Sequence, residues 1–413
     1  MRGPVSLVLS GFFLLAPDVL AADALAADEP ALKTPAAVST KRFSASFTAP
    51  FVFVATGSGV IISEQGEILT NHHVIADSCS PLSPVLTVRL ADGGEAAARL
   101  VATDPVGDLA LLRLEPLPRI PRFAVLSATI PPPGTPVIAV GNPFALGDLD
   151  DQPTISQGVL STGRIVRQTY VDCLQHDAAA NPGNSGGPLF TRDGALLGIT
   201  GAIRSRSGFR INSGIGLTIA APAIARFLPA LRSAPGGWVL RTAAPEGLTL
   251  ERDDHGVRVQ NPVAPLRSGD RVLRIDDRSC PSVMTAENLF CSWPWVAGMT
   301  IDVQILRDGK ELTVAVPAGR SVIPGKPWIG FTLTERGGRL LVADLEAQSP
   351  AAGAGVVNDE TVLSANGVTL NTRLDALRVT APLAIGDRLE LTLRAGDGAE
   401  RTVTCWVAAA HQP

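Results

Sequence analysis

The residue types best suited to chemistry in this chain are a serine, one of two adjacent histidines and an aspartate. Ser185 lies in the segment Gly183-Asn-Ser-Gly-Gly-Pro188, where glycines allow a sharp turn that exposes a hydroxyl group. The same glycines let backbone N–H groups converge on one point, where they can stabilise an oxyanion. A glycine-rich turn is common, so the segment needs partners elsewhere in the chain before it indicates a nucleophile.

Two upstream residues can be those partners. His73 lies in Thr70-Asn-His-His-Val74, after an apolar run, and Asp108 begins Asp-Leu-Ala-Leu-Leu-Arg-Leu. The order histidine, aspartate, serine is that of the two-barrel chymotrypsin-like arrangement. The alternative for a glycine-bordered serine is an α/β-hydrolase, in which the acid and then the histidine follow the serine in the sequence. Only His255 and His411 follow Ser185, and both lie in the C-terminal repeats. The constellation therefore favours a serine nucleophile of the two-barrel type.

The elements that must position these residues are mostly strands. From residue 51 to about 228, short apolar runs recur between turn signals, which is typical of a barrel or sandwich and not of alternating βαβ units. The predicted strands are 51–55, 60–62, 85–90, 109–114, 137–140, 196–199 and 215–219, followed by a helix over 221–231 and a linker over 233–237.

The C-terminal part contains two related segments. Both have a strand, a helix and another strand: residues 268–276 correspond to 358–366, and residues 297–308 correspond to 385–394. The helices are expected near 284–291 and 372–379. The pattern predicts two tandem small α/β modules.

Several segments together resemble the HtrA/Deg family of trypsin-like serine proteases. They are Gly57-Ser-Gly-Val-Ile-Ile, Leu69-Thr-Asn-His-His-Val, Asp108-Leu-Ala-Leu-Leu, Gly141-Asn-Pro-Phe, Asp177-Ala-Ala-Ala-Asn-Pro-Gly-Asn-Ser-Gly-Gly-Pro-Leu and Gly214-Ile-Gly-Leu-Thr-Ile. Ser349-Pro-Ala-Ala-Gly-Ala-Gly-Val, followed by Asn366-Gly367, resembles the PDZ domains of that family. The resemblance covers roughly residues 50 to 410. It implies an all-β chymotrypsin-like double β-barrel protease domain followed by two small α/β PDZ-like domains.

The expected domain boundaries follow from the resemblance and from the composition. They are a signal peptide at 1–26, a flexible lead at 27–48, the protease domain at 49–232, and PDZ-like domains at 238–320 and 326–410. In the stretch 163–172, where many relatives of this family carry a longer regulatory loop, the chain is short.

The family pattern assigns roles within the triad. It places the catalytic histidine directly before the valine, so His73 is the expected base and His72 is not. Asp108 orients it, and the N–H groups of Gly183 and Ser185 form the expected oxyanion hole, with Asn184 between them. Digestive relatives have aspartate at this last position, which pairs with a newly cut N-terminus. An asparagine carries no such charge, so activation is not expected to need that cleavage.

The same resemblance points to binding residues. The base of the specificity pocket is expected at Ala179, and the strand with Ile199, Thr200 and Gly201 beside it. Since no carboxylate is there, a small or medium apolar side chain is the expected preference. In the second PDZ-like domain, the expected peptide-binding residues are Ile329, Gly330, Phe331, Leu374 and Leu377.

Composition limits the other possibilities. The 35 Lys and Arg against 39 Asp and Glu give a net charge of −4 with no basic block, which argues against nucleic acid. No metal or organic cofactor is expected, because the histidines are not grouped with other ligands. Arg2, the apolar run 5–16 and small residues after it are typical of a signal peptide, with an uncleaved anchor as the alternative. We therefore expect a periplasmic or secreted protein.

Five cysteines are present, and Cys280 and Cys291 are the most plausible disulfide pair. Two buried free thiols are the alternative.

The expected function is a serine endopeptidase that hydrolyses unfolded or misfolded exported proteins, with PDZ-like domains that bind C-terminal peptide tails. Peptide or unfolded protein substrates are the expected partners, and the resemblance implies a homotrimer. The alternative is a chaperone or peptide-binding module in which the protease fold is only a scaffold. The complete triad argues against that alternative, because a scaffold does not need all three groups.

Overall fold

The computed structural model describes residues 51–54, 57–76, 85–91, 93–116, 122–146, 152–167, 170–203, 214–323 and 326–409. The expected signal peptide and lead, and Cys79, lie outside these ranges. Within them, no helix is long and apolar enough to cross a membrane.

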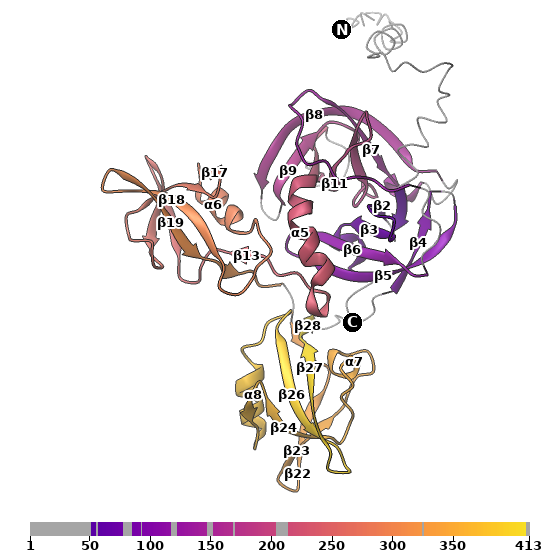
Figure 1. Ribbon diagram of the computed structural model, residues 1–413, viewed down its shortest axis with the longest axis vertical. Coiled ribbons are helices and arrows are strands. Elements are labelled where there is room, and N and C mark those ends of the chain that lie inside the picture. Colours follow the sequence, from indigo (N-terminus) through magenta and orange to yellow (C-terminus); the bar gives the residue numbers. More distant parts are fainter. Residues whose placement is uncertain are drawn as a thin grey trace, which may run out of the picture. The chain divides into compact units, whose positions relative to one another are not determined.

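The first part of the chain forms two closed six-stranded barrels (Figure 1). The first barrel has the order β1-β2-β3-β6-β5-β4. Its strands are β1 (Phe51–Val54), β2 (Gly57–Ile61), β3 (Glu67–Thr70), β4 (Val85–Leu90), β5 (Glu95–Asp104) and β6 (Leu109–Leu114), with the short helix α3 (His72–Ile75) after β3.

The second barrel has the order β10-β11-β12-β9-β8-β7. Its strands are β7 (Pro136–Gly141), β8 (Thr154–Arg167), β9 (Tyr170–His176), β10 (Pro188–Thr191), β11 (Leu196–Ile203) and β12 (Gly216–Ala220), and the 3-10 turn η1 (Pro143–Ala145) follows β7. The expectation of a short loop over 163–172 is confirmed, because β8 and β9 extend into it and pair up to Arg167 and Tyr170.

A shared hydrophobic core joins the barrels. It combines Leu69 and Leu111 of the first barrel with Ile138 and Phe190 of the second, all buried. Helix α5 (Ala221–Ser233) contributes Phe227 and further apolar side chains to the same core. Each barrel also has an apolar interior of its own. The expected all-β double barrel is therefore confirmed, and chemistry placed where the barrels meet rests on a rigid support.

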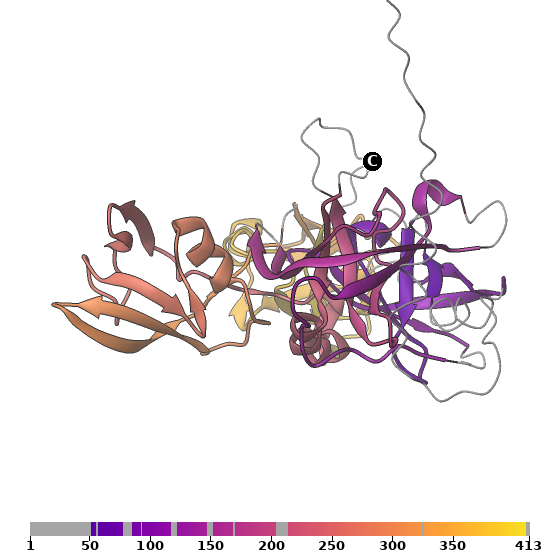
Figure 2. The same ribbon diagram turned by 90° about the horizontal axis from the view of Figure 1, so that it is seen from above.

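After α5 and the 3-10 turn η2 (Pro235–Gly237), the chain forms a first module, residues 242–320. Its main sheet has the order β14-β15-β16-β18-β19, with β17 beside β16, and β18 and β19 form a long hairpin (Figure 2). The elements are β13 (Thr242–Ala243), β14 (Thr249–Asp253), β15 (Gly256–Asn261), β16 (Arg271–Ile275), β17 (Arg278–Ser279), α6 (Val283–Phe290), β18 (Thr300–Arg307), β19 (Lys310–Pro317) and β20 (Gly319–Arg320).

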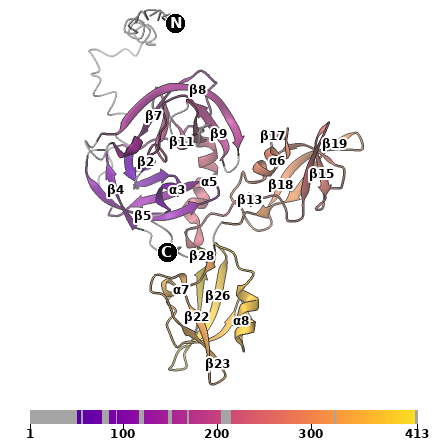
Figure 3. The ribbon, with the colours of Figure 1, turned by 180° about the vertical axis from the view of Figure 1, so that it is seen from behind.

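The second module, residues 327–409, repeats this plan with the order β22-β23-β24-β26-β27 and β25 beside β24. Helices α7 and α8 lie on either side of its sheet (Figure 3). The elements are β21 (Pro327–Trp328), β22 (Thr332–Arg336), β23 (Arg339–Ala343), α7 (Pro350–Gly353), β24 (Thr361–Ala365), β25 (Val368–Thr369), α8 (Arg373–Thr380), β26 (Arg388–Arg394), β27 (Glu400–Trp406) and β28 (Ala408–Ala409).

Local capping explains where the module helices begin. Ser282 accepts a hydrogen bond from the N–H of Thr285 at the start of α6. Thr372 and Asp375 form a reciprocal capping box at the start of α8.

The predicted internal repeat is confirmed by the matching strand order of the two sheets and by the matching positions of α6 and α8 in the chain.

The predicted disulfide is wrong. Cys280 and Cys291 are both free thiols. Cys280 is buried after β17, and Cys291 is the C-terminal cap of α6. A disulfide needs two side chains that point toward each other at a specific distance, and closeness in sequence does not ensure this when one cysteine follows a strand and the other ends a helix.

Candidate active site

His73 and Asp108 are in direct contact in the first barrel. His73 lies in α3, and Asp108 ends the turn between β5 and β6. The Asp108 oxygens Oδ1 and Oδ2 lie 3.0 and 2.8 Å from Nδ1 of His73, and Oδ1 also accepts the His73 backbone N–H at 2.9 Å. A carboxylate at Nδ1 fixes the imidazole in one orientation and tautomer, which makes Nε2 the nitrogen that can accept a proton.

Exposure also suits these two side chains to their expected roles. The His73 side chain is 48% exposed, and that of Asp108 only 12%. Asp108 has φ of 59°, in the left-handed region, and its carbonyl oxygen accepts a hydrogen bond from Nδ2 of Asn71 at 2.9 Å. The aspartate is therefore enclosed and oriented, while the imidazole can reach a substrate.

The neighbouring His72 faces a different environment. Its Nδ1 lies 2.8 Å from the Thr103 hydroxyl oxygen, and burial lowers its pKa below the usual value. Since its ring is engaged at Thr103, the geometry supports His73 over His72 as the base.

The serine turn lies against the strand that precedes His73. The Ser185 carbonyl oxygen accepts the N–H of Ser58 at 2.9 Å. A Cβ on Gly57 would lie 2.9 Å from the Val74 side chain and 3.0 Å from that same carbonyl oxygen. Gly57 thus separates Ser185 from the residue that follows His73, and any larger residue there would push the two apart.

The turn itself depends on glycines. Gly183 and Gly186 have φ of 98° and 84°, which favours glycine at both positions. A Cβ on Gly186 would lie 2.0 Å from the Ser58 carbonyl oxygen. Asn184 is buried, and its Nδ2 donates to the Ala179 carbonyl at 3.3 Å. The uncharged side chain at this position is held within its own loop.

Ser58 has a supporting position that sequence reasoning did not assign. Its hydroxyl donates to the Gly183 carbonyl at 2.8 Å and accepts the Asn142 backbone N–H at 3.0 Å. This one side chain ties the serine turn to the end of β7. The signal was present in Gly57-Ser-Gly, because a buried serine between close-packed glycines needs hydrogen-bond partners.

The residues expected at the specificity pocket differ in which of their groups are free to line it. The Ala179 carbonyl also accepts from the Ser156 hydroxyl at 2.9 Å, which fixes this segment. Thr200 and Gly201 are buried in β11, and the Thr200 carbonyl accepts the Gly186 N–H at 2.8 Å. The side chain of Ile199 belongs to the shared core. Its side chain therefore does not line a pocket, and only the backbone of β11 remains for substrate contact at this position.

The second module has a cavity of about 250 Å³ at the expected peptide loop. It is lined by Pro327, Trp328, Ile329, Gly330, Phe331, Thr380, Ala381, Leu383 and Val407. Leu374 and Leu377 are exposed and do not line it. The end of α8 and the residues after it line this cavity, and the role of the two leucines in peptide binding stays a prediction.

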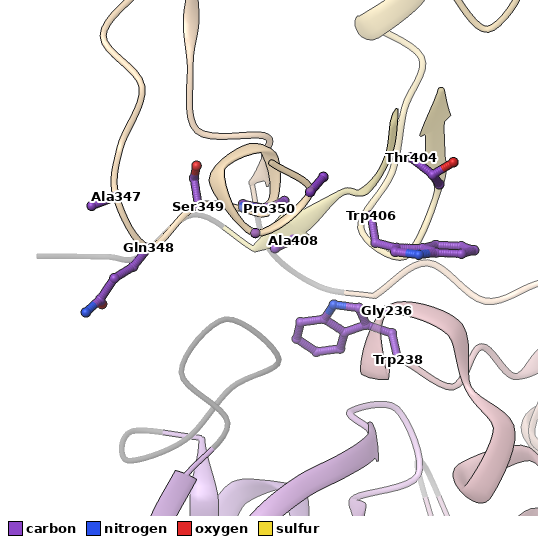
Figure 4. A pocket seen from close by; sticks show the side chains of 11 residues that line it. Gly236, Trp238, Ala347, Gln348, Ser349, Pro350, Thr404, Trp406 and Ala408 are labelled. Atoms are coloured by element: carbon purple, nitrogen blue, oxygen red, sulfur yellow. The ribbon is translucent and has the colours of Figure 1, made fainter. Parts of the chain in front are cut away.

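Another cavity, of about 380 Å³, has Trp238 and Trp406 among its lining residues (Figure 4). The remaining residues around it are Gly236, Ala347, Gln348, Ser349, Pro350, Gly353, Ala354, Thr404 and Ala408. None of these side chains is a carboxylate, histidine, lysine or cysteine. Among the residues that the structure describes, no group of three or more His, Cys, Asp or Glu side chains could hold a metal ion.

Two barrels that bring a histidine–aspartate pair beside a glycine-bordered serine define the class of trypsin-like serine peptidases. A family model described as "Trypsin-like peptidase domain" matches residues 57–199.

Curated relatives extend the match. A "Probable periplasmic serine endoprotease DegP-like" of Pseudomonas fulva (strain 12-X) is 33% identical over 282 residues, 64% of this chain and 55% of that protein. The protein so named in Brucella suis biovar 1 (strain 1330) is 30% identical over 362 residues, 78% of this chain and 67% of that protein. The solved structure "HtrA-type protease AlgW with tripeptide" has a TM-score of 0.54 and 28% identity, over 69% of this chain and 99% of that one.

The chain therefore belongs to the HtrA/DegP family of serine proteases, as the sequence motifs predicted. It spans about half the length of several of the curated relatives it matches, 55% in Pseudomonas fulva.

Proposed function

We propose that this chain is a serine endopeptidase in which His73, Asp108 and Ser185 form the catalytic triad. The observation that carries the proposal is the contact of both Asp108 oxygens with Nδ1 of His73, at 3.0 and 2.8 Å, beside a serine turn. In this arrangement Nε2 of His73 takes the proton from Ser185 and returns it to the leaving amine.

The remaining groups would stabilise and select the substrate. The N–H groups of Gly183 and Ser185 would receive the oxyanion, with Asn184 holding the loop between them. The pocket would lie at Ala179, beside the β11 backbone at Thr200, and would take a small or medium apolar side chain, because no carboxylate is there to attract a basic one.

The substrates would be unfolded or misfolded exported proteins. The relatives in Pseudomonas and Brucella are named as probable periplasmic endoproteases, and the N-terminal sequence is typical of a signal peptide. We therefore assign this chain to the periplasm or the exterior. We also propose the homotrimer implied by the resemblance, which light scattering of the purified protein would test.

Substitutions at the triad test the activity. With unfolded casein as substrate, Ser185→Ala and His73→Ala should each lower kcat by about 10⁴-fold or more, with folding intact. His72→Ala is the matched control, since His72 contacts Thr103 and not Asp108, and it should keep most of the activity. Loss of activity in the His72 variant alone would show that the base is misassigned. No cleavage by the wild-type protein would favour the chaperone reading.

The modules at 238–320 and 326–410 would be PDZ-like domains, and the second would bind apolar C-terminal tails. Its cavity lies at the loop with Ile329, Gly330 and Phe331, and backbone N–H groups in such a loop can hold a carboxylate. The test is a titration of Ser185→Ala protein with a peptide ending in an apolar residue. Amidation of the peptide carboxylate should abolish binding, and equal binding of both forms would rule out this mode.

A further inference from the structure

The side chain of Arg241 is buried against the turn that carries Asp108. Arg241 lies between α5 and β13, 137 positions after Asp104 in the sequence. Its Nε donates to Asp104 Oδ2 at 2.6 Å, and the two side chains are 5% and 0% exposed. An ion pair so enclosed cannot lose one partner without leaving an uncompensated charge inside the protein.

This ion pair acts on the backbone between Asp104 and Asp108. The second oxygen of Asp104, Oδ1, accepts the N–H of Gly107 at 2.8 Å. The Arg241 guanidinium lies directly on Gly107, where a Cβ would be only 1.7 Å from Nη2. The next residue is Asp108, which has a φ of 59° and contacts His73. The turn is therefore held at its first residue and at the residue before the aspartate.

Arg241 is itself held from three sides. Its Nη1 donates to the Cys291 carbonyl at the end of α6, at 3.1 Å, and its backbone exchanges two hydrogen bonds with Ser321. The guanidinium carbon lies 4.0 Å from the centre of the Phe227 ring in α5. A rigid support of this kind can transmit its own position to the turn, which a solvated arginine could not.

We propose that Arg241 is a positioning residue for the aspartate of the triad. It holds the turn 104–108 in the conformation in which Asp108 meets His73, and it makes the first module part of the support of the active site. The inference rests on the proposed peptidase function, but it concerns the aspartate and not the serine turn.

The test measures kcat and KM of the full-length protein with a fluorogenic peptide. Arg241→Gln should lower kcat by about 10- to 10³-fold, less than complete loss of the aspartate, with KM little changed. Arg241→Lys keeps the charge and should recover part of the loss if the Gln variant folds poorly.

Arg232→Gln is the matched control. Arg232 also pairs with an enclosed carboxylate of the first barrel, that of Glu67, but not at the Asp108 turn. It should lower the melting temperature and leave kcat and KM unchanged. An equal fall of kcat in this control would overturn the inference, since general loss of stability would then explain both variants.

A double-mutant cycle gives an independent result. Gly107 does not have a left-handed φ, and the three atoms nearest to an added Cβ all belong to the Arg241 guanidinium. Gly107→Ala should reproduce the loss of kcat in the wild-type background and add little in an Arg241→Ala background. If folded Gly107→Ala and Arg241→Gln both kept the wild-type kcat, the inference would be overturned, while the triad variants would still support the proposed function. An inactive wild-type protein would instead overturn the function, and this inference with it.

Discussion

Arg232 and Glu67 form a two-bond ion pair that fastens the last turn of α5 to strand β3. Nε of Arg232 donates to Oε1 at 2.9 Å, and Nη2 donates to Oε2 at 2.7 Å. The Glu67 side chain is 6% exposed. The hydrogen bonds from Arg232 hold the pKa of Glu67 below its usual value of 4.5. The helix that completes the shared core is thus tied to the first barrel by a charge as well as by apolar contacts.

Glu67→Gln should therefore destabilise the protein at neutral pH, by about 1–2 kcal/mol, because Arg232 is partly exposed and its side of the pair is screened. A carboxyl group whose pKa is lowered by folding stabilises the folded state above its unfolded pKa. That stabilisation is lost as pH falls below 4.5 through the lowered folded value. Urea unfolding curves of the two proteins should differ at about pH 7 and converge in acid. Equal stability at neutral pH would contradict this account.

His176 predicts a second dependence on pH. The residue is completely buried in β9, its Nε2 lies 3.1 Å from the Thr218 hydroxyl oxygen, and burial lowers its pKa from 6.5 to about 4. The unfolded chain binds the proton more readily between these values, so the contribution of His176 to stability should fall as pH drops from 6.5 to 4 and change no further below that. The shift corresponds to roughly 3 kcal/mol at most.

His176→Gln cannot titrate and provides the comparison. Its stability should decline less steeply than that of the wild type across this pH range, as followed by thermal melting at several pH values. Parallel curves would show that His176 does not contribute.

Free thiols at Cys280 and Cys291 give a chemical prediction. Burial raises the pKa of Cys280 to about 11 and also raises that of Cys291. Both should react slowly with iodoacetamide in the native protein and rapidly in denaturant without any reductant. Peptide mapping should find the two residues alkylated in separate peptides. A peptide pair that becomes reactive only after reduction would show a disulfide.

The sequence predicted local structure better than side-chain placement. The strands 85–90 and 109–114 have the predicted bounds, because short apolar runs between turn signals define them without help from distant contacts. The burial of the Ile199 side chain in the shared core could not be predicted, since a strand buried on both faces shows no alternation that would separate the core side from the substrate side.

The ion pair between Asp104 and Arg241 could not be predicted from the sequence for another reason. Asp104 and Arg241 are 137 positions apart, and an arginine after a helix looks like any solvated charge. Gly107 carried the only local sign, since a glycine next to the aspartate marks a close approach of some other group. The identity of that group depends on the packing of the folded chain.

Gly186 makes the sharpest prediction about the serine turn. A Cβ there would lie 2.0 Å from the Ser58 carbonyl oxygen and 2.3 Å from the Thr70 hydroxyl, and φ is 84°. Gly186→Ala must displace the turn next to Ser185, and a misplacement near 1 Å costs about 10²-fold in rate. Casein cleavage should therefore fall at least about that much.

Gly194 is the matched control for the backbone. It has φ of 90°, and a Cβ there would meet nothing within 4 Å. Gly194→Ala should thus carry only the left-handed strain, roughly 1–2 kcal/mol, and lower the melting temperature while activity is kept. If the two alanine variants lost activity equally, strain alone would explain the effect. Full activity of Gly186→Ala would contradict the prediction, because it would mean that the turn can hold a Cβ beside Ser58 and Thr70 without moving Ser185.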